Sequence, residues 1–212
     1  EINDENNSDD LDESIDDISY ENELDLQDAD IALYAVDDVF EVGSLTYKVL
    51  SADTVQVGDG DTAMTGLSGS VTIPSSVKYG GTTYKVTAIG DRAFLRCSDI
   101  TSLEIPDTVT AIGELALADI GVSTITIPDS VETLGDNVLS GASMTSVTLS
   151  SKLTTIPDRA FNSCPNLREV TIPDSVTEIE TYAFNSCSSL TTITIPKNVE
   201  YIGGCNGNLQ GI

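Results

Sequence analysis

The side chains that most often carry enzyme chemistry are scarce in this sequence. No His occurs among its 212 residues, so the usual base that activates a Ser or Cys nucleophile and the commonest nitrogen ligand of zinc are both missing. Two carboxylates, Glu104 and Glu169, remain as candidates for a hydrolytic pair. They belong to repeats that are three steps apart, which is about 14 Å at the spacing of stacked strands and too far for a glycosidase. We therefore expect a protein that is not an enzyme and needs no cofactor or metal ion.

Four cysteines are the next residues that could do chemistry. Cys97, Cys164 and Cys187 occupy one position of a sequence repeat, and apolar side chains replace them in other repeats. This substitution predicts buried thiols that behave as small hydrophobic groups. Cys164 and Cys187 belong to neighbouring repeats, so a bond between them stays open, although we expect their backbones to lie beyond the ~7 Å limit for a disulfide. Cys205 falls outside the repeat.

Acidic turn residues could in principle bind a cation. The stretch "GDGDT" at 58–62 invites a calcium interpretation, but its spacing matches neither the EF-hand loop nor the nonapeptide calcium repeat. Asp-Gly pairs are also ordinary turn residues. Asp107, Asp129 and Asp174 each follow an Ile-Pro pair, and we expect each to cap its own following turn through a side-chain oxygen.

Repeats of 22 or 23 residues must position all of these side chains. Alternating apolar residues, as in Leu103-x-Ile105, predict a short strand with one buried face, and the following Pro ends its ladder. One such unit cannot close a core, whereas stacked units can. We therefore predict one continuous parallel sheet from about residue 70 to 195, with five inward side chains: Leu103, Ile125, Val147, Val170 and Ile193.

The segment after each strand has a different spacing. In the unit that begins at Val170, the next apolar residues are Val176, Ile179, Ala183 and Phe184, three or four positions apart. This spacing suits a turn of α-helix or 3₁₀ helix. We therefore predict short helical or 3₁₀ returns on the side opposite the strands.

The repeats resemble those of the BspA-like leucine-rich repeat family. The shared pattern is "LxxIxIPxxVxxIxxxAFxxC", and it covers about residues 66–203. It weakens in the middle, where Leu149-Ser150 loses the Pro and where Ala116-Leu117 and Val138-Leu139 replace Ala-Phe. The resemblance implies a curved leucine-rich repeat solenoid of α/β type, exported to the surface of a bacterial cell or secreted, with a role in adhesion or recognition.

Two echoes of another motif precede or interrupt the repeats. "GSLTYKV" at 43–49 and "GGTTYKV" at 80–86 both predict β-hairpins, since Gly suits the tight turn and Tyr and Val pair across strands. We assign residues 39–69 to a β-rich N-terminal cap and residues 70–203 to the repeats, with a hairpin insertion at 78–86. Residues 204–212 form a closing segment, and the sequence does not say whether the chain normally continues past Ile212.

The charge distribution restricts the possible partners. The formal net charge is −26, and 17 of the 35 acidic residues lie in residues 1–41, which contain no Lys or Arg. We interpret residues 1–38 as an acidic flexible segment, although recruitment of a basic partner by this segment is an alternative. Nucleic acid and anionic lipid would be repelled. No apolar run approaches the roughly 20 residues of a membrane span, so we expect no membrane insertion, and we expect a monomer.

The exposed strand residues form the candidate binding face. Stacking would align them into two columns rich in hydroxyl groups, which suit hydrogen bonds to a polypeptide or a glycan, although β-branched Thr also simply favours an exposed strand. We interpret the chain as a non-catalytic, adhesin-like recognition module for an extracellular protein or glycan, with any signal peptide already removed. A structural spacer of a larger cell-envelope protein, without its own ligand, is the alternative. The candidate face consists of Thr72, Glu104, Thr124, Thr126, Thr148, Glu169, Thr171, Thr192 and Thr194.

Overall fold

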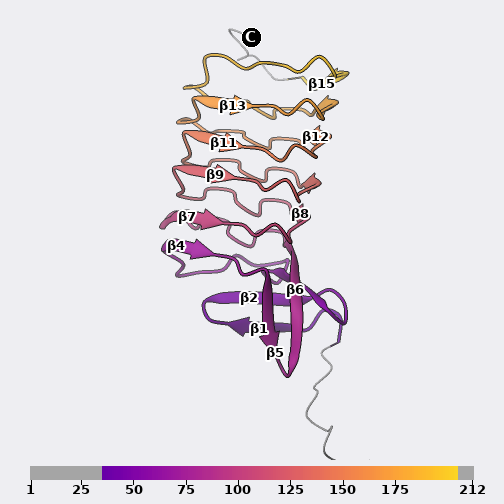
Figure 1. Ribbon diagram of the computed structural model, residues 1–212. Helices are drawn as coiled ribbons and strands as arrows, with labels where there is room; N and C mark the ends of the chain where they lie inside the picture. The colour runs from indigo at the N-terminus through magenta and orange to yellow at the C-terminus, as the bar shows by residue number, and fades with distance from the viewer. Residues whose placement is uncertain (1–34, 205–212) are drawn as a thin grey trace, which may run out of the picture. The chain divides into compact units, whose positions relative to one another are not determined.

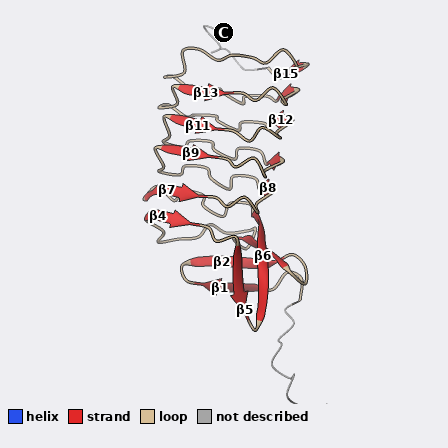
Figure 2. Ribbon diagram, in the orientation of Figure 1, coloured by secondary structure: helices blue, strands red, loops and turns tan. Residues whose placement is uncertain are grey.

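The computed structural model describes residues 35–204, all of which belong to one compact unit. Strands, turns and loops make up this part of the chain, and no helix occurs in it (Figure 2). The strands are β1 (Val39–Val42), β2 (Leu45–Val49), β3 (Thr54–Val57), β4 (Gly69–Thr72), β5 (Ser76–Tyr79), β6 (Thr82–Ile89), β7 (Ile100–Glu104), β8 (Ala111–Ile112), β9 (Thr124–Thr126), β10 (Thr133–Leu134), β11 (Ser146–Thr148), β12 (Thr155–Ile156), β13 (Glu169–Thr171), β14 (Glu178–Ile179) and β15 (Tyr201–Ile202).

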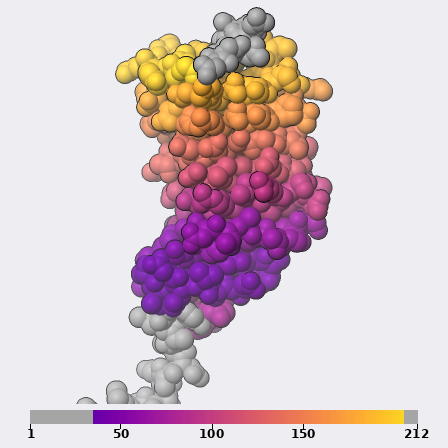
Figure 3. All heavy atoms as spheres, turned by 180° about the vertical axis from the view of Figure 1, so that it is seen from behind, coloured from indigo at the N-terminus to yellow at the C-terminus, as the bar shows by residue number. Residues whose placement is uncertain are grey.

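Each repeat forms one coil, and the first strands of successive coils lie side by side in parallel (Figure 1). In the space-filling view, the coils follow one another in chain order (Figure 3). Val147 pairs in register with Ile125 on one side and with Val170 on the other. All five side chains predicted to point inward are buried. The alternation of apolar and polar residues therefore predicted correctly which face of the strands is buried.

The predicted continuity of this sheet is wrong. β4 pairs only with β7, while β9, β11 and β13 form a separate three-stranded sheet, and Thr194 joins β13 through an isolated bridge to Thr171. Just before the break between β7 and β9, the two coils make a very close backbone contact. The N–H of Gly121 donates to the carbonyl of Cys97, and a Cβ on Gly121 would lie 1.9 Å from the carbonyl oxygen of Ser98. The coils are thus held together just before the strand and not by a ladder along it.

A second set of short parallel strands runs along the stack. β6, β8 and β10 pair in one sheet, and β12, β14 and β15 pair in another. Ala111, for example, pairs with Ala88 in the coil before it and with Thr133 in the coil after it. Most of these strands contain two residues, which is too short for an alternating pattern to reveal them in the sequence.

The predicted helical returns are also wrong, because the hydrogen bonds run between coils. The N–H groups of Phe94 and Arg96 donate to carbonyls of the next coil at 2.8 Å, whereas the N–H of Leu95 donates to the Arg92 carbonyl within its own turn. Two residues per turn adopt positive φ, which an α-helix does not contain. These residues are Arg92 and Arg96, Leu115 and Asp119, Asn137 and Gly141, Arg159 and Ser163, and Tyr182 and Ser186.

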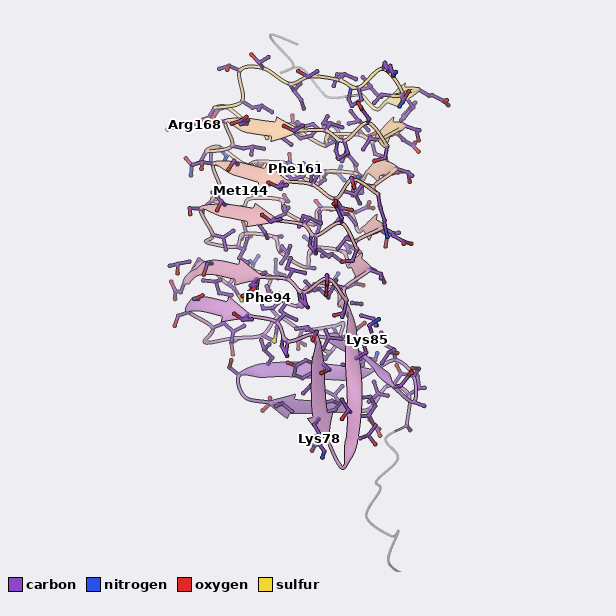
Figure 4. The ribbon with its side chains drawn as sticks, viewed as in Figure 1. Lys78, Lys85, Phe94, Met144, Phe161 and Arg168 are labelled. Atoms are coloured by element: carbon purple, nitrogen blue, oxygen red, sulfur yellow. The ribbon has the colours of Figure 1, made fainter. Side chains whose placement is uncertain are left out.

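The core consists of the inward strand residues and one large side chain from each turn. Phe94 and Phe161 are fully buried inside their coils (Figure 4). The rings of Phe161 and Phe184 stack with centroids 5.1 Å apart and planes within 7° of parallel. Leu117 and Leu139 take the equivalent positions of the two coils between Phe94 and Phe161, and both are fully buried. These coils therefore keep a large apolar side chain in the core although they lack the Ala-Phe pair.

The N-terminal strands and the insertion form one sheet with the first repeats. β1 and β2 make the first predicted hairpin and β5 and β6 the second, and β6 pairs in parallel with β3. An aromatic cluster packs the second hairpin against the first, since the ring of Phe40 stacks on that of Tyr79 with centroids 4.3 Å apart. Tyr47 and Tyr84 complete the cluster and are almost fully buried.

One glycine position explains the repeated "IG" of the sequence. A Cβ on Gly135 would lie 2.4 Å from the backbone nitrogen of Glu114, and a Cβ on Gly203 would lie 2.4 Å from that of Thr181. Carbon atoms do not approach backbone atoms so closely, so these residues permit close contact between successive coils. Pro157 and Glu180 hold this position in the two coils between them.

Candidate functional site

The candidate face lies on the exposed side of the first strands. Within the sheet of β9, β11 and β13, Thr126, Thr148 and Thr171 are in register, and the bridge from Thr171 extends this column to Thr194. All four side chains are exposed. We call this row of four residues the threonine column. Consecutive residues along it are separated by the spacing of adjacent strands, about 4.8 Å.

A second column runs beside the first and is less uniform. Thr124, Ser146 and Glu169 are in register. Thr124 and Glu169 are exposed, whereas Ser146 is half-buried. Thr192, the candidate residue of the last repeat, is also exposed, but it belongs to no strand ladder.

The remaining candidates lie in the separate pair of β4 and β7. Thr72 is in register with Glu104, and its hydroxyl donates to a carboxylate oxygen of Glu104 at 3.2 Å. The Ser102 hydroxyl donates to that of Ser70 at 2.8 Å. Glu104 is therefore already hydrogen-bonded within the face. It lies in a different sheet from Glu169, so the structure does not bring the two carboxylates together as a catalytic pair.

Sequence reasoning missed a hollow next to Ser70 and Thr72. This hollow has a volume of about 250 Å³, and its polar wall includes Ser44 and Ser68. Ser44 follows Gly43 in the turn between β1 and β2. It comes from a segment that contains no repeat, and no pattern in the sequence linked it to the strand face.

The three cysteines that the structure describes are buried and free. The Cys187 thiol donates to the Phe161 carbonyl at 3.1 Å, and the Cys164 thiol donates to the Leu139 carbonyl at the same distance. The hydrogen bond with Cys187 and burial both raise the pKa of the Cys164 thiol, which disfavours a reactive thiolate. Cys205 lies outside the described residues.

The expected separation of the coils at the cysteine position is wrong. The N–H of Phe161 donates to the Ala183 carbonyl, and the N–H of Ser163 donates to the Asn185 carbonyl, each at 2.8 Å. Hydrogen bonds of this length hold the two backbones side by side immediately before Cys164 and Cys187. The reason is the inter-coil bonding of the turns, which replaces the helical returns that we predicted.

The loop at 58–62 uses its first carboxylate to close a turn. Asp59 accepts hydrogen bonds from the N–H groups of Asp61 and Thr62 at 2.8 and 2.7 Å, and from the Thr62 hydroxyl. Partial burial alone would raise the pKa of Asp59, but these hydrogen bonds outweigh it and hold the pKa below its usual value. Within residues 35–204, no group of three or more potential metal-ligating side chains occurs.

The aspartates that follow Ile-Pro do not all act as predicted. A carboxylate oxygen of Asp129 accepts the N–H of Ser151 at 2.8 Å. Ser151 lies at the equivalent position of the next coil, so this carboxylate joins two coils and does not cap its own turn. Such a partner cannot be read from local sequence because it lies 22 residues away.

Comparison with known proteins supports the family suggested by the repeats. The model of the BspA type leucine rich repeat region matches residues 87–206 in six copies. None of the curated proteins compared with the chain matches it. No helix in the described part of the chain is long and apolar enough to cross a membrane.

Solved structures of bacterial leucine-rich repeat proteins resemble the chain. One from Eubacterium ventriosum has a TM-score of 0.52 and 19% sequence identity, over 74% of this chain and 48% of that one. One from Bacteroides capillosus has a TM-score of 0.44 and 30% identity, over 73% of this chain and 96% of that one. One from Bacteroides ovatus has a TM-score of 0.47 and 22% identity, over 77% of this chain and only 55% of that one.

Proposed function

The chain belongs to the BspA-type leucine-rich repeat family, and on this premise we propose that it is a non-catalytic recognition module of a bacterial surface or secreted protein. Its ligand is an extracellular protein or glycan that binds across the exposed strand face. A structure from Faecalibacterium prausnitzii that resembles the chain is described as a leucine rich cell surface protein, which agrees with this location.

The observation that carries the proposal is the threonine column. Thr126, Thr148, Thr171 and Thr194 present four exposed side chains at the regular spacing of parallel coils. A hydroxyl group can both donate and accept a hydrogen bond. No hydrogen bond from these hydroxyls to another described residue is present, so they remain available for a polar ligand that runs along the stack.

The spacer function is the second candidate, and two observations favour it. The two columns contain no aromatic side chain and no Arg, although such residues usually dominate the binding energy of protein interfaces. Some polar groups of the candidate face are also already hydrogen-bonded to each other, since the Thr72 hydroxyl donates to Glu104. A spacer would leave the columns exposed in every state of the protein.

Threonine methyl resonances distinguish these two functions. The full chain would first be screened against an array of glycans and matrix proteins, and then titrated with each compound that binds. We expect the methyl signals of Thr126, Thr148 and Thr171 to shift. Signals of Thr110 and Thr177, which precede the second set of strands and donate hydrogen bonds to the preceding coil, should stay unchanged. An array without any binding partner would favour the spacer.

A further inference from the structure

A polar pocket lies in the N-terminal part of the described chain, outside the candidate face. It has a volume of about 370 Å³, which is within the range of roughly 300–1,000 Å³ that is typical of small-ligand sites. Acidic Glu41 and Asp59 line it, together with four residues that carry hydroxyl groups and with apolar residues that include Met64. The four hydroxyl residues are Ser44, Thr46, Thr62 and Thr65.

Met64, one of the residues that line this pocket, is held rigidly. The backbone N–H of Met64 donates to the Ala93 carbonyl at 3.0 Å, and the Met64 carbonyl accepts the Cys97 thiol at 3.4 Å. The Met64 sulfur also accepts the N–H of Thr46 at 3.4 Å. Met64 is 8% exposed. These contacts link the loop to β2 and to the first repeat, so little conformational freedom is lost when a ligand binds.

Several polar groups of the pocket have no partner within the described residues. The hydroxyls of Ser44, Thr46 and Thr65 form no hydrogen bond there, and Glu41 forms no ion pair. Glu41 pairs directly with Thr46 across β1 and β2. Asp59 has the opposite role, since the hydrogen bonds from its own loop fix its carboxylate at the wall. The pocket thus combines a fixed acidic wall with free donors and acceptors.

The charge of the pocket selects among polar ligands. No basic residue lines it. The nearby Lys48 forms an ion pair with Asp37 at 3.0 Å and lines a different hollow. Two carboxylates would repel a sialic or uronic acid, because like charges in an interface suppress the wrong partner. A neutral sugar instead offers hydroxyl donors to the carboxylates and C–H groups to the apolar residues of the pocket.

From these features we propose that this pocket binds one residue of a neutral glycan. The hollow beside Ser68 and Ser70 shares Ser44 with it, and it provides a second polar surface for the neighbouring sugar. This site is formed by residues outside the threonine column, so it does not rest on the proposed function of that column.

The test is an array of neutral and anionic oligosaccharides probed with the full chain and two triple variants. The cap variant combines Glu41→Gln, Thr46→Val and Thr65→Val, which remove a charge and two hydroxyls with little change of shape. The column variant combines Thr126→Val, Thr148→Val and Thr171→Val. We expect neutral glycans to bind, the cap variant to lose about tenfold or more of the affinity, and the column variant to retain it.

Amide chemical shifts of the unmodified chain provide a readout that does not depend on the variants. A neutral oligosaccharide should shift the signals of residues 41–46 and 59–65 and leave those of residues 124–126 in place. Binding restricted to anionic glycans would overturn the proposal, as would an array without glycan binding. Neutral binding that only the column variant abolishes would also overturn it and would assign the glycan to the strand face.

Discussion

Single residues in this protein act mainly across the step from one coil to the next. Asp129 accepts an N–H from Ser151 of the following coil, and the Asn185 side-chain amide donates to the Asn162 side-chain oxygen at 2.8 Å. Buried Ser150 stands where most repeats have Pro, and its hydroxyl donates to the Val131 carbonyl at 2.6 Å. These side chains therefore contribute to the stability of the fold through hydrogen bonds to an adjacent coil.

Replacement of Phe184 by Ala should destabilise the fold. The ring is 8% exposed and stacks on Phe161, and its loss removes buried area and leaves a cavity. We expect a decrease of about 3 kcal/mol in the free energy of unfolding, the lower end of the usual range, because a hollow of about 60 Å³ already borders this ring. Urea unfolding would measure it. Thr171→Ala is the matched surface change and should stay within about 0.5 kcal/mol; equal losses would contradict this packing.

The carboxylate of Asp59 should make stability depend on pH. Its folded pKa lies below the unfolded value, because Thr62 and Asp61 donate hydrogen bonds to the charged form. The contribution is therefore present above the unfolded pKa of about 3.9 and is lost as the pH falls through the still lower folded pKa. We expect the difference in melting temperature between the parent chain and Asp59→Ala to shrink as the pH falls from 5 to 3. A difference that stays constant over this range would exclude the carboxylate as its source.

At the scale of elements, the sequence predicts strands better than turns. Leu103 and Ile125 are recognisable as inward strand residues because alternation reports one buried face directly. The prediction of helical returns was wrong because the spacing of the apolar residues up to Ala183 and Phe184 fits a helix and also fits these turns. In each turn two residues adopt the left-handed conformation, with positive φ. The candidate columns followed from the same alternation. The pocket at Met64 did not, since residues 39–46 and 59–65 build it and neither segment belongs to the repeat. Residues 1–34 and 205–212, which contain most of the predicted flexible and closing segments, lie outside the described part.

The turns make a specific prediction about glycine. Ser163 has a φ of 58°, a conformation that costs a non-glycine residue roughly 1–2 kcal/mol. Ser163→Gly should raise the free energy of unfolding by about 0.5–1 kcal/mol, after the larger entropy loss of Gly is subtracted. Ser163→Val should lower it, since a β-branched side chain tolerates this conformation poorly. Thermal unfolding would measure both changes.

The control for this prediction is Ser143→Gly, at an exposed residue without positive φ. There the substitution should lower the free energy of unfolding by about 0.5 kcal/mol. An equal change in the free energy of unfolding for Ser143→Gly and Ser163→Gly would contradict the positive φ that the structure assigns to Ser163.

At the scale of the whole molecule, parallel stacking turns a repeated sequence into a repeated surface. The same position of successive repeats supplies Thr126, Thr148, Thr171 and Thr194, so one side-chain type becomes an extended row. The Arg168 side chain, which is exposed at the outer margin of β13 (Figure 4), is the cation adjacent in sequence to this face. The threonine column thus offers hydrogen bonds over a long distance and carries no charge itself, as the proposed function requires.

The most direct test of the proposed function replaces Thr126, Thr148 and Thr171 together by Lys. These side chains are exposed, so we expect the melting temperature to change little, while three long charged side chains block the column. Surface plasmon resonance would compare the parent chain and the variant on the same immobilised protein or glycan. The proposed function predicts that binding is abolished in the variant. Equal binding by the two proteins would contradict recognition through the strand face.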